Sequence, residues 1–219
     1  MNINDYLLKD IKALGLQDSV NSAQKLFKNF PITHFPLVEN GELLGSFAED
    51  DMHTIENKEA ILGSYTHLAN YFFSDENATV LELLKIFADN DTNIIPVLNT
   101  DKNYIGYYDL HDVLDAFSMS PFMLEESETV IIEKLENDSS MSEVTQIVEA
   151  NGGKLLGIYI SEKHDSFLQV TLKIISDDMN EIMQNFRRYD YKIISSHQND
   201  KYLEDLKYRL DYLQKYLDL

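Results

Sequence analysis

The stretch NYIGYYDLHDV, residues 103–113, brings together side chains that could do chemistry. Asp109, His111 and Asp112 place two carboxylates and an imidazole within four residues. These residue types allow three interpretations: an acid–base pair, a metal site, or a helix start that is capped by an acid.

The three interpretations make different demands on the local structure. Two carboxylates catalyse acid–base chemistry only where burial or mutual repulsion separates their pKa values, and an exposed helix start provides neither. A metal ion needs convergent ligands, whereas Asp109, His111 and Asp112 cannot all point the same way on one helical turn. Capping needs only an Asp at the N-cap and a second acid in the first turn, worth roughly 0.5–2 kcal/mol. We therefore favour capping, with ligand contact by Asp112 as the second interpretation.

The rest of the chain contains no recognisable catalytic constellation. It has no cysteine, no glycine-rich phosphate loop and no GxSxG nucleophile turn. The remaining histidines follow neither an HxxxH nor an HExxH pattern; they are His34, His53, His67, His164 and His197. The sequence predicts neither an enzyme nor a metal site.

The charge of the chain limits its partners. The 219 residues carry a net charge of −20, and 44% of them are hydrophobic. Nucleic acid and anionic membranes attract clustered Lys and Arg, so neither is an expected partner. No apolar run approaches the roughly 18 residues of a membrane span, and the first residues are too polar for a signal peptide. We expect a cytoplasmic protein, and the excess of Lys over Arg with many Asn and Ile suits an AT-rich bacterial genome.

A repeat explains why Asp112 lies where it does. Residues 18–52 match residues 78–113, because the same types of residue recur at equivalent positions. At a shift of 60 residues the matched pairs are Val20 and Val80, Phe27 and Phe87, and Pro36 and Pro96. At a shift of 61 residues they are Gly45 and Gly106, and Asp51 and Asp112.

Each copy predicts the same order of elements. Apolar residues at helical spacing come first, in residues 20–30 and 80–87. A short strand that contains Pro, a polar turn, a second strand and a second helix follow. We therefore predict two α–β–β–α repeats, about 1–58 and 59–120, which form a pseudo-symmetric unit over residues 1–120.

The paired segments HFPLVENGELLGSFAEDDM and NIIPVLNTDKNYIGYYDLHDV resemble cystathionine-β-synthase (CBS) domains, which occur in tandem as a Bateman module. The resemblance implies that the pair dimerises as a flat disc and binds adenosine nucleotides in the clefts between its repeats. In that family the second strand ends in Gly, two apolar residues, Thr or Ser, two variable residues and Asp. The hydroxyl holds phosphate near a helix N-terminus, and the Asp binds the ribose hydroxyls.

Matched to this pattern, the chain keeps the ribose Asp twice, as Asp51 and Asp112. It lacks the hydroxyl twice, because Ala48 and Asp109 stand there, and Asp109 would place a negative charge where phosphate should lie. The nucleotide-binding candidates are Asp51, Asp112 and His111, with AMP, ATP or a related adenine nucleotide as the expected ligand. Lys9 and Lys12 are further cations that could approach a phosphate.

The second half predicts a different fold. Pro121 and the acids after it suggest a linker over residues 121–127. Residues 128–197 then alternate in the order β–α–β–β–α–β of a ferredoxin-like domain, so the whole chain is α+β. Within this class SEVTQIVEANGGKLLGIYI resembles an ACT domain, a regulatory module that often binds amino acids. Residues 136–141 lack the Pro-Gly of ligand-binding members, which leaves dimerisation of the sheets as the simpler role.

The chain ends in a predicted helix over residues 198–219. Its leucines alternate at spacings of three and four residues: Leu203, Leu206, Leu210, Leu213 and Leu217. This row of leucines is short for an independent coiled coil. The predicted helix could therefore dock on its own chain or on a dimer mate, and the sequence allows both.

The order of a CBS pair and an ACT-like domain resembles the bacterial acetoin-utilisation protein B-like group. We expect a non-catalytic regulatory module that senses a small ligand, most simply an adenine nucleotide, and forms a homodimer through the CBS pair. The alternatives are a degenerate scaffold that acts only in dimerisation or partner binding, and an enzyme of unrecognised type.

Overall fold

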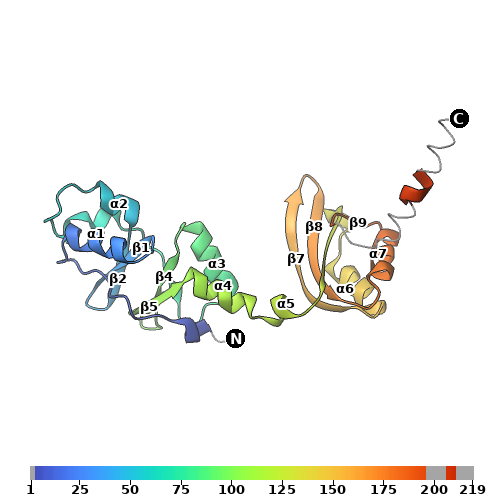
Figure 1. The fold of residues 1–219 in the computed structure, drawn as a ribbon, viewed down its shortest axis with the longest axis horizontal. Helices are drawn as coiled ribbons and strands as arrows, with labels where there is room; N and C mark the ends of the chain where they lie inside the picture. Colours follow the sequence, from blue (N-terminus) through green and yellow to red (C-terminus); the bar gives the residue numbers. More distant parts are fainter. Residues whose placement is uncertain (1–2, 196–205, 211–219) are drawn as a thin grey trace. The chain divides into compact units, whose positions relative to one another are not determined.

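The computed structural model of the chain describes residues 3–195 and 206–210 and divides it into two compact units (Figure 1). The first unit is Met1–Ser120 and the second is Pro121–Leu219. The fold is mixed α+β, as the sequence predicts.

The first unit contains two copies of the same α–β–β–α order, which confirms the predicted repeat. The first copy comprises α1 (Val20–Asn29), β1 (His34–Glu39), β2 (Glu42–Ala48) and α2 (Glu49–Thr54). The second comprises α3 (Val80–Asp89), β4 (Ile94–Leu98), β5 (Tyr104–Asp109) and α4 (Leu110–Ser118). Three short elements fill the remaining segments: η1 (Ile3–Tyr6), η2 (Leu62–Leu68) and β3 (Ser74–Asp75).

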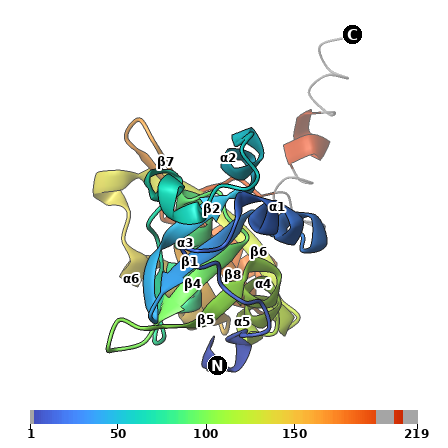
Figure 2. The same cartoon turned by 90° about the vertical axis from the view of Figure 1, so that its left-hand side faces the viewer.

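The two hairpins lie next to each other in the middle of the unit, with the helices outside them (Figures 1 and 2). Both are antiparallel, and both shift register at the same place, between Leu37 and Val38 and between Val97 and Leu98. Facing each shift is a glycine with positive φ: Gly45 at +145° and Gly106 at +150°. Each glycine therefore adopts a backbone conformation that an L side chain rarely takes.

In each repeat, the segment that precedes the first helix pairs with the other repeat. Leu8, ahead of the first repeat, exchanges two backbone hydrogen bonds of 2.9 and 3.0 Å with Tyr107 in β5. Asn70, ahead of the second repeat, exchanges two of 2.8 Å with Ser46 in β2. The repeats are therefore interlocked, because neither entry segment can leave without breaking a strand pairing of the other repeat.

The hydrophobic cores reflect this exchange. Ile94 and Tyr107 belong to the second repeat, yet both are buried in the core cluster that α1, β1, β2 and α2 form. A smaller cluster lies under α3 and α4, where Leu83, Phe87 and Val113 are buried.

The second unit is a four-stranded sheet with two helices. Its elements are β6 (Glu128–Leu135), α6 (Met141–Ala150), β7 (Lys154–His164), β8 (Phe167–Ile175), α7 (Met179–Arg188) and β9 (Lys192–Ile193). All pairings are antiparallel and the strand order is β7-β8-β6-β9, which is the arrangement of a ferredoxin-like βαββαβ domain. One sheet face packs on α6 and α7 through a core that includes Val170, Leu172 and Phe186.

Two predicted segments have a different outcome. The stretch expected as a linker contains a short helix, α5 (Pro121–Leu124), and the ring of Phe122 lies against Gly157 of β7. Most of the predicted terminal helix, with Leu203, Leu213 and Leu217, lies outside the described residues. Residues 206–210 are helical and exposed.

Substituting Gly106 should test the interlocking. A Cβ at Gly106 would lie 2.3 Å from the carbonyl oxygen of Leu8, and the φ of +150° adds strain. We expect Gly106→Ala to lower the free energy of unfolding of the first unit by about 3 kcal/mol or more, measured by urea denaturation.

Gly41→Ala is the matched control, because Gly41 also has a positive φ but its Cβ would meet only Asn103 Oδ1 at 3.5 Å. Its cost should be about 1–2 kcal/mol. Equal costs for the two variants would show that the entry segment does not depend on Gly106.

Candidate ligand site at the strand-to-helix turns

The two predicted ribose aspartates lie at equivalent turns, each between a second strand and the helix that follows it. The same backbone bond closes both turns. Glu49 N donates to Thr33 O at 2.9 Å, and Leu110 N donates to Asn93 O at 2.9 Å. The residue before each first strand therefore anchors the start of the second helix of its own repeat.

These two anchor residues also bind each other across the repeats. Asn93 Oδ1 accepts from Thr33 N at 2.8 Å and from Thr33 Oγ1 at 3.1 Å, and Asn93 N donates to Thr33 Oγ1 at 3.0 Å. Asn93 Nδ2 donates to Pro31 O at 2.7 Å, which fixes the orientation of the amide. We call this pair the Thr33–Asn93 clamp.

Sequence reasoning missed the clamp. Its signal was present, because Thr33 and Asn93 stand 60 residues apart, each three positions before the Pro of its strand. The repeat alignment places Thr33 and Asn93 at equivalent positions. Their residue types differ, so the sequence does not indicate that the two side chains bind each other.

The first turn contains a buried histidine beside Asp51. His34 is 7% exposed, its Nδ1 lies 2.9 Å from Thr33 Oγ1, and its ring meets Phe72 edge-on. Burial lowers the pKa of His34, while the charges of Asp51 and Asp91 act in the opposite direction. A neutral imidazole therefore lies within electrostatic reach of one carboxylate from each repeat.

The Thr33 hydroxyl links this imidazole to the clamp. Thr33 Oγ1 lies 3.1 Å from Asn93 Oδ1, 3.3 Å from Thr92 Oγ1 and 2.9 Å from His34 Nδ1. Asp51, in the first turn of α2, is partly buried.

The second turn is chemically different. Asp109 is the N-cap of α4, and its Oδ1 accepts from His111 N at 2.8 Å and from Asp112 N at 3.4 Å. The capping interpretation is confirmed for Asp109. Ala48, at the equivalent position in the first turn, makes no side-chain cap. The carboxylate of Asp109 thus already uses the amide groups that a phosphate would need.

Asp112 and His111 do not converge at this turn. Asp112 is partly buried in the first turn of α4, whereas the His111 side chain is 83% exposed with Nε2 3.9 Å from Asp115. The position equivalent to His34 is occupied by Ile94, which is 1% exposed. The structure brings Asp51 to a histidine that the sequence analysis treated as scattered, and it leaves His111 in solvent.

The second turn also faces additional negative charge. The Tyr107 hydroxyl donates to Asp10 at 2.7 Å. Burial, the hydrogen bond to Asp10 and the charge of Asp109 together raise the pKa of Tyr107 well above its ordinary value. Lys9 and Lys12 are exposed, and the stem of Lys9 passes over Gly106.

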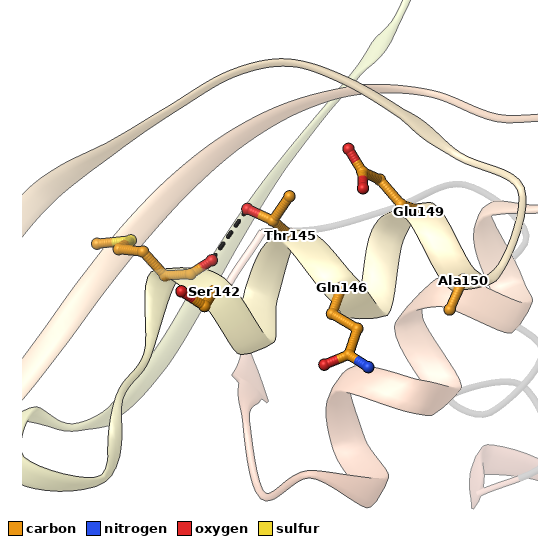
Figure 3. A pocket seen from close by; sticks show the side chains of 6 residues that line it. Ser142, Thr145, Gln146, Glu149 and Ala150 are labelled. Atoms are coloured by element: carbon orange, nitrogen blue, oxygen red, sulfur yellow. Dashed lines mark hydrogen bonds between the residues drawn. The ribbon is translucent and has the colours of Figure 1, made fainter.

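Within residues 3–195 and 206–210, no group of three or more His, Asp or Glu side chains is arranged to hold a metal ion. A depression of about 600 Å³ on the second unit is lined by one helix alone (Figure 3). Its lining residues are Met141, Ser142, Thr145, Gln146, Glu149 and Ala150. Thr145 donates to Met141 O there, so this hydroxyl is used within the helix.

The second repeat matches a known family. Residues 69–119 match the family model of the CBS domain. The first repeat has the same element order and the same hairpin irregularity as this matched repeat. None of the helices in the described part of the chain is both long and apolar enough to cross a membrane.

Individual relatives are distant. An uncharacterized protein of Methanocaldococcus jannaschii, MJ0188, is 22% identical over 114 residues, which are 52% of this chain and 43% of that protein. The chain thus spans less than half the length of this curated relative. Among solved structures, a CBS domain pair/ACT domain protein from Thermotoga maritima is 15% identical with a TM-score of 0.49, covering 55% of this chain and all of that one. CBSX2 in complex with AMP is 14% identical with a TM-score of 0.46, covering 53% and 95%.

The buried His34 should make stability depend on pH. Its folded-state pKa is lowered from 6.5, so the unfolded chain takes up a proton that the folded chain resists. This cost is absent above the unfolded pKa and grows as pH falls from 6.5 toward the folded pKa. We expect urea denaturation between about pH 7.5 and about pH 5.5 to show a steeper loss of stability for the native chain than for His34→Gln. Parallel pH profiles would contradict the burial of a neutral imidazole.

Proposed function

We propose that the first unit is a regulatory module that binds one adenine nucleotide per chain, at the first turn. The observation that carries this proposal is that Asp51, partly buried in the first turn of α2, acts electrostatically on the buried His34. The carboxylate of Asp51 is suited to accept hydrogen bonds from the two ribose hydroxyls, as the CBS resemblance implies. The Thr33–Asn93 clamp holds the turn in place without using Asp51.

The second turn is not the nucleotide site in this proposal. Asp109 fills the cap position with a negative charge, and Asp10 and Asp112 add two more carboxylates to the same region. A phosphate there would have to displace the cap and approach like charges in a partly desolvated turn. Asp112 stays a candidate ribose contact only for a ligand without phosphate.

The module is proposed to act without catalysis, in a cytoplasmic bacterial protein of the acetoin-utilisation-like group. It forms a homodimer through the CBS-type pair, and ligand binding changes how the chain engages its partners. The β6–α6 connection of the second unit, residues 136–140, lacks the Pro-Gly of amino-acid-binding ACT domains. The role proposed for this unit is therefore dimerisation through its sheet.

A second candidate is a scaffold whose ligand sites are degenerate. The specific observation in its favour is the Asp109 cap, which turns a ligand position into a helix-stabilising one. The scaffold differs from the regulatory module in one measurable respect, since no nucleotide or amino acid would change its stability.

Nucleotide titration distinguishes the two candidates. We expect AMP or ATP to bind with one site per chain in isothermal titration calorimetry. Asp51→Asn should weaken binding about tenfold or more, because hydrogen bonds to a charged acceptor are worth about 1.5–3 kcal/mol. Asp112→Asn is the matched control at the equivalent position and should bind as the native chain does. An absence of binding for AMP, ATP, NADH and S-adenosylmethionine would leave the scaffold as the function.

Removing the charge at the second turn should open it to anions. Asp109→Ser keeps a good N-cap and deletes the carboxylate. We expect the number of bound AMP molecules per chain to rise above one. Asp115→Ser deletes the same charge on the exposed face of α4, 63% exposed in its side chain, and should leave the stoichiometry unchanged. If Asp109→Ser binds no additional AMP, the charge of Asp109 is not what closes the second turn.

A further inference from the structure

The chain contains two Asn-Gly pairs, Asn40–Gly41 and Asn151–Gly152, and no other asparagine is followed by glycine. An Asn-Gly pair can react with itself, because glycine has no side chain that keeps its main-chain nitrogen away from the amide carbon of the Asn. The sequence makes the two pairs equivalent. The structure places them in different surroundings, and these surroundings decide which pair can react.

The first pair forms the two-residue turn between β1 and β2. Both residues have a positive φ, +53° at Asn40 and +87° at Gly41, which is typical of a tight hairpin turn. Asn40 is exposed. Within the described part of the chain, no hydrogen bond holds the Asn40 amide and none occupies Gly41 N. The Asn40 side chain can therefore rotate toward Gly41 N, and this N–H can exchange its proton with water.

The second pair ends α6 and is held by hydrogen bonds. Asn151 Nδ2 donates to Ile147 O at 2.6 Å, and Asn151 Oδ1 accepts from Asn185 Nδ2 at 2.9 Å. Gly152 N donates to Glu149 O at 3.1 Å. Both groups that would have to react, the amide of Asn151 and the nitrogen of Gly152, are therefore fixed in place.

We propose that Asn40 is a site of spontaneous covalent modification and that Asn151 is protected from the same reaction. Gly41 N loses its proton and attacks Cγ of Asn40, so a carbon–nitrogen bond forms and closes a five-membered imide. The bond from Cγ to Nδ2 breaks, and the amide nitrogen takes up one proton and leaves as ammonia. Water then adds across one of the two ring bonds to Gly41 N, which gives Asp or isoaspartate. Water is the only co-reactant, and nothing is oxidised or reduced.

The isoaspartate product affects a turn that joins the two repeats. Gly41 O accepts from Tyr104 N at 2.8 Å, and Glu42 forms an isolated bridge with Asn103. Isoaspartate routes the main chain through the side-chain Cβ, which adds one carbon to a turn whose length the two strands fix. It also adds a negative charge between Glu39 and Glu42. The reaction therefore weakens the pairing of the two hairpins at this turn.

Peptide mass mapping of the aged protein tests the site. The folded native chain is incubated at mildly alkaline pH and sampled over time. We expect the peptide with Asn40 to gain about 1 Da, and to do so about tenfold or more faster than the peptide with Asn151. A carboxyl methyltransferase specific for isoaspartate measures how much of this product forms. In the chain unfolded by guanidinium chloride, both asparagines should react at similar rates, because the local sequence is the same.

Two variants separate the causes. Gly41→Ala adds a Cβ that hinders the attacking nitrogen, and it should slow the reaction at Asn40 about tenfold or more. Asn40→Asp has the charge of the product on a main chain of normal length. The chain with isoaspartate at position 40, separated by chromatography, should have a lower melting temperature than Asn40→Asp.

Three outcomes would contradict the proposal. If the folded native chain gains no mass at Asn40, or if Asn151 reacts equally fast, the turn is not a selective site. If the unfolded chain shows the same preference as the folded one, the hydrogen bonds around Asn151 do not protect it. If the isoaspartate chain melts as Asn40→Asp does, the longer main chain does not weaken the hairpin pairing. None of these outcomes depends on the proposed nucleotide binding.

Discussion

The first unit depends on the close passage of two entry segments over two glycines. Gly106 has no side chain, and the carbonyl of Leu8 occupies the space where a Cβ would lie. At Gly45 the Cβ of Ala69 and the carbonyl of Asn70 make the equivalent approach. Since each entry segment belongs to one repeat and pairs with the other, the two hairpins are held side by side. The Thr33–Asn93 clamp lies where this arrangement brings the two turns together.

One structural position then decides how the two turns differ. Both turns use the same backbone bond and both retain an Asp in the first helical turn. In the second turn a carboxylate at the N-cap satisfies two backbone N–H groups, which stabilises α4 and fills the place of an anion. In the first turn Ala48 caps nothing, and α2 ends after six residues instead of the nine of α4. A residue that strengthens a helix start thus occupies the backbone N–H groups that an anion would need.

Local features of the sequence predicted most of the elements. Helical spacing located α1 and α3, and capping was foreseen at Asp109. Each of these depends on neighbours within about four residues, a range over which periodicity and capping act. The helix over Pro121–Leu124 was missed because it is one turn long, and Phe122 finds its support on Gly157, in a strand that begins thirty residues later.

The sequence by itself determined the repeat, the element order of both units, and the chemical difference between Ala48 and Asp109. Only the tertiary structure decided which side chains meet. Asp10 and Tyr107 are 97 residues apart and Thr33 and Asn93 are 60 residues apart, yet both pairs share hydrogen bonds. His34 is buried and the His111 side chain is exposed for the same reason. The surroundings of a side chain depend on which distant segments pack against its turn. The tertiary fold decides this, and the neighbours in the sequence do not.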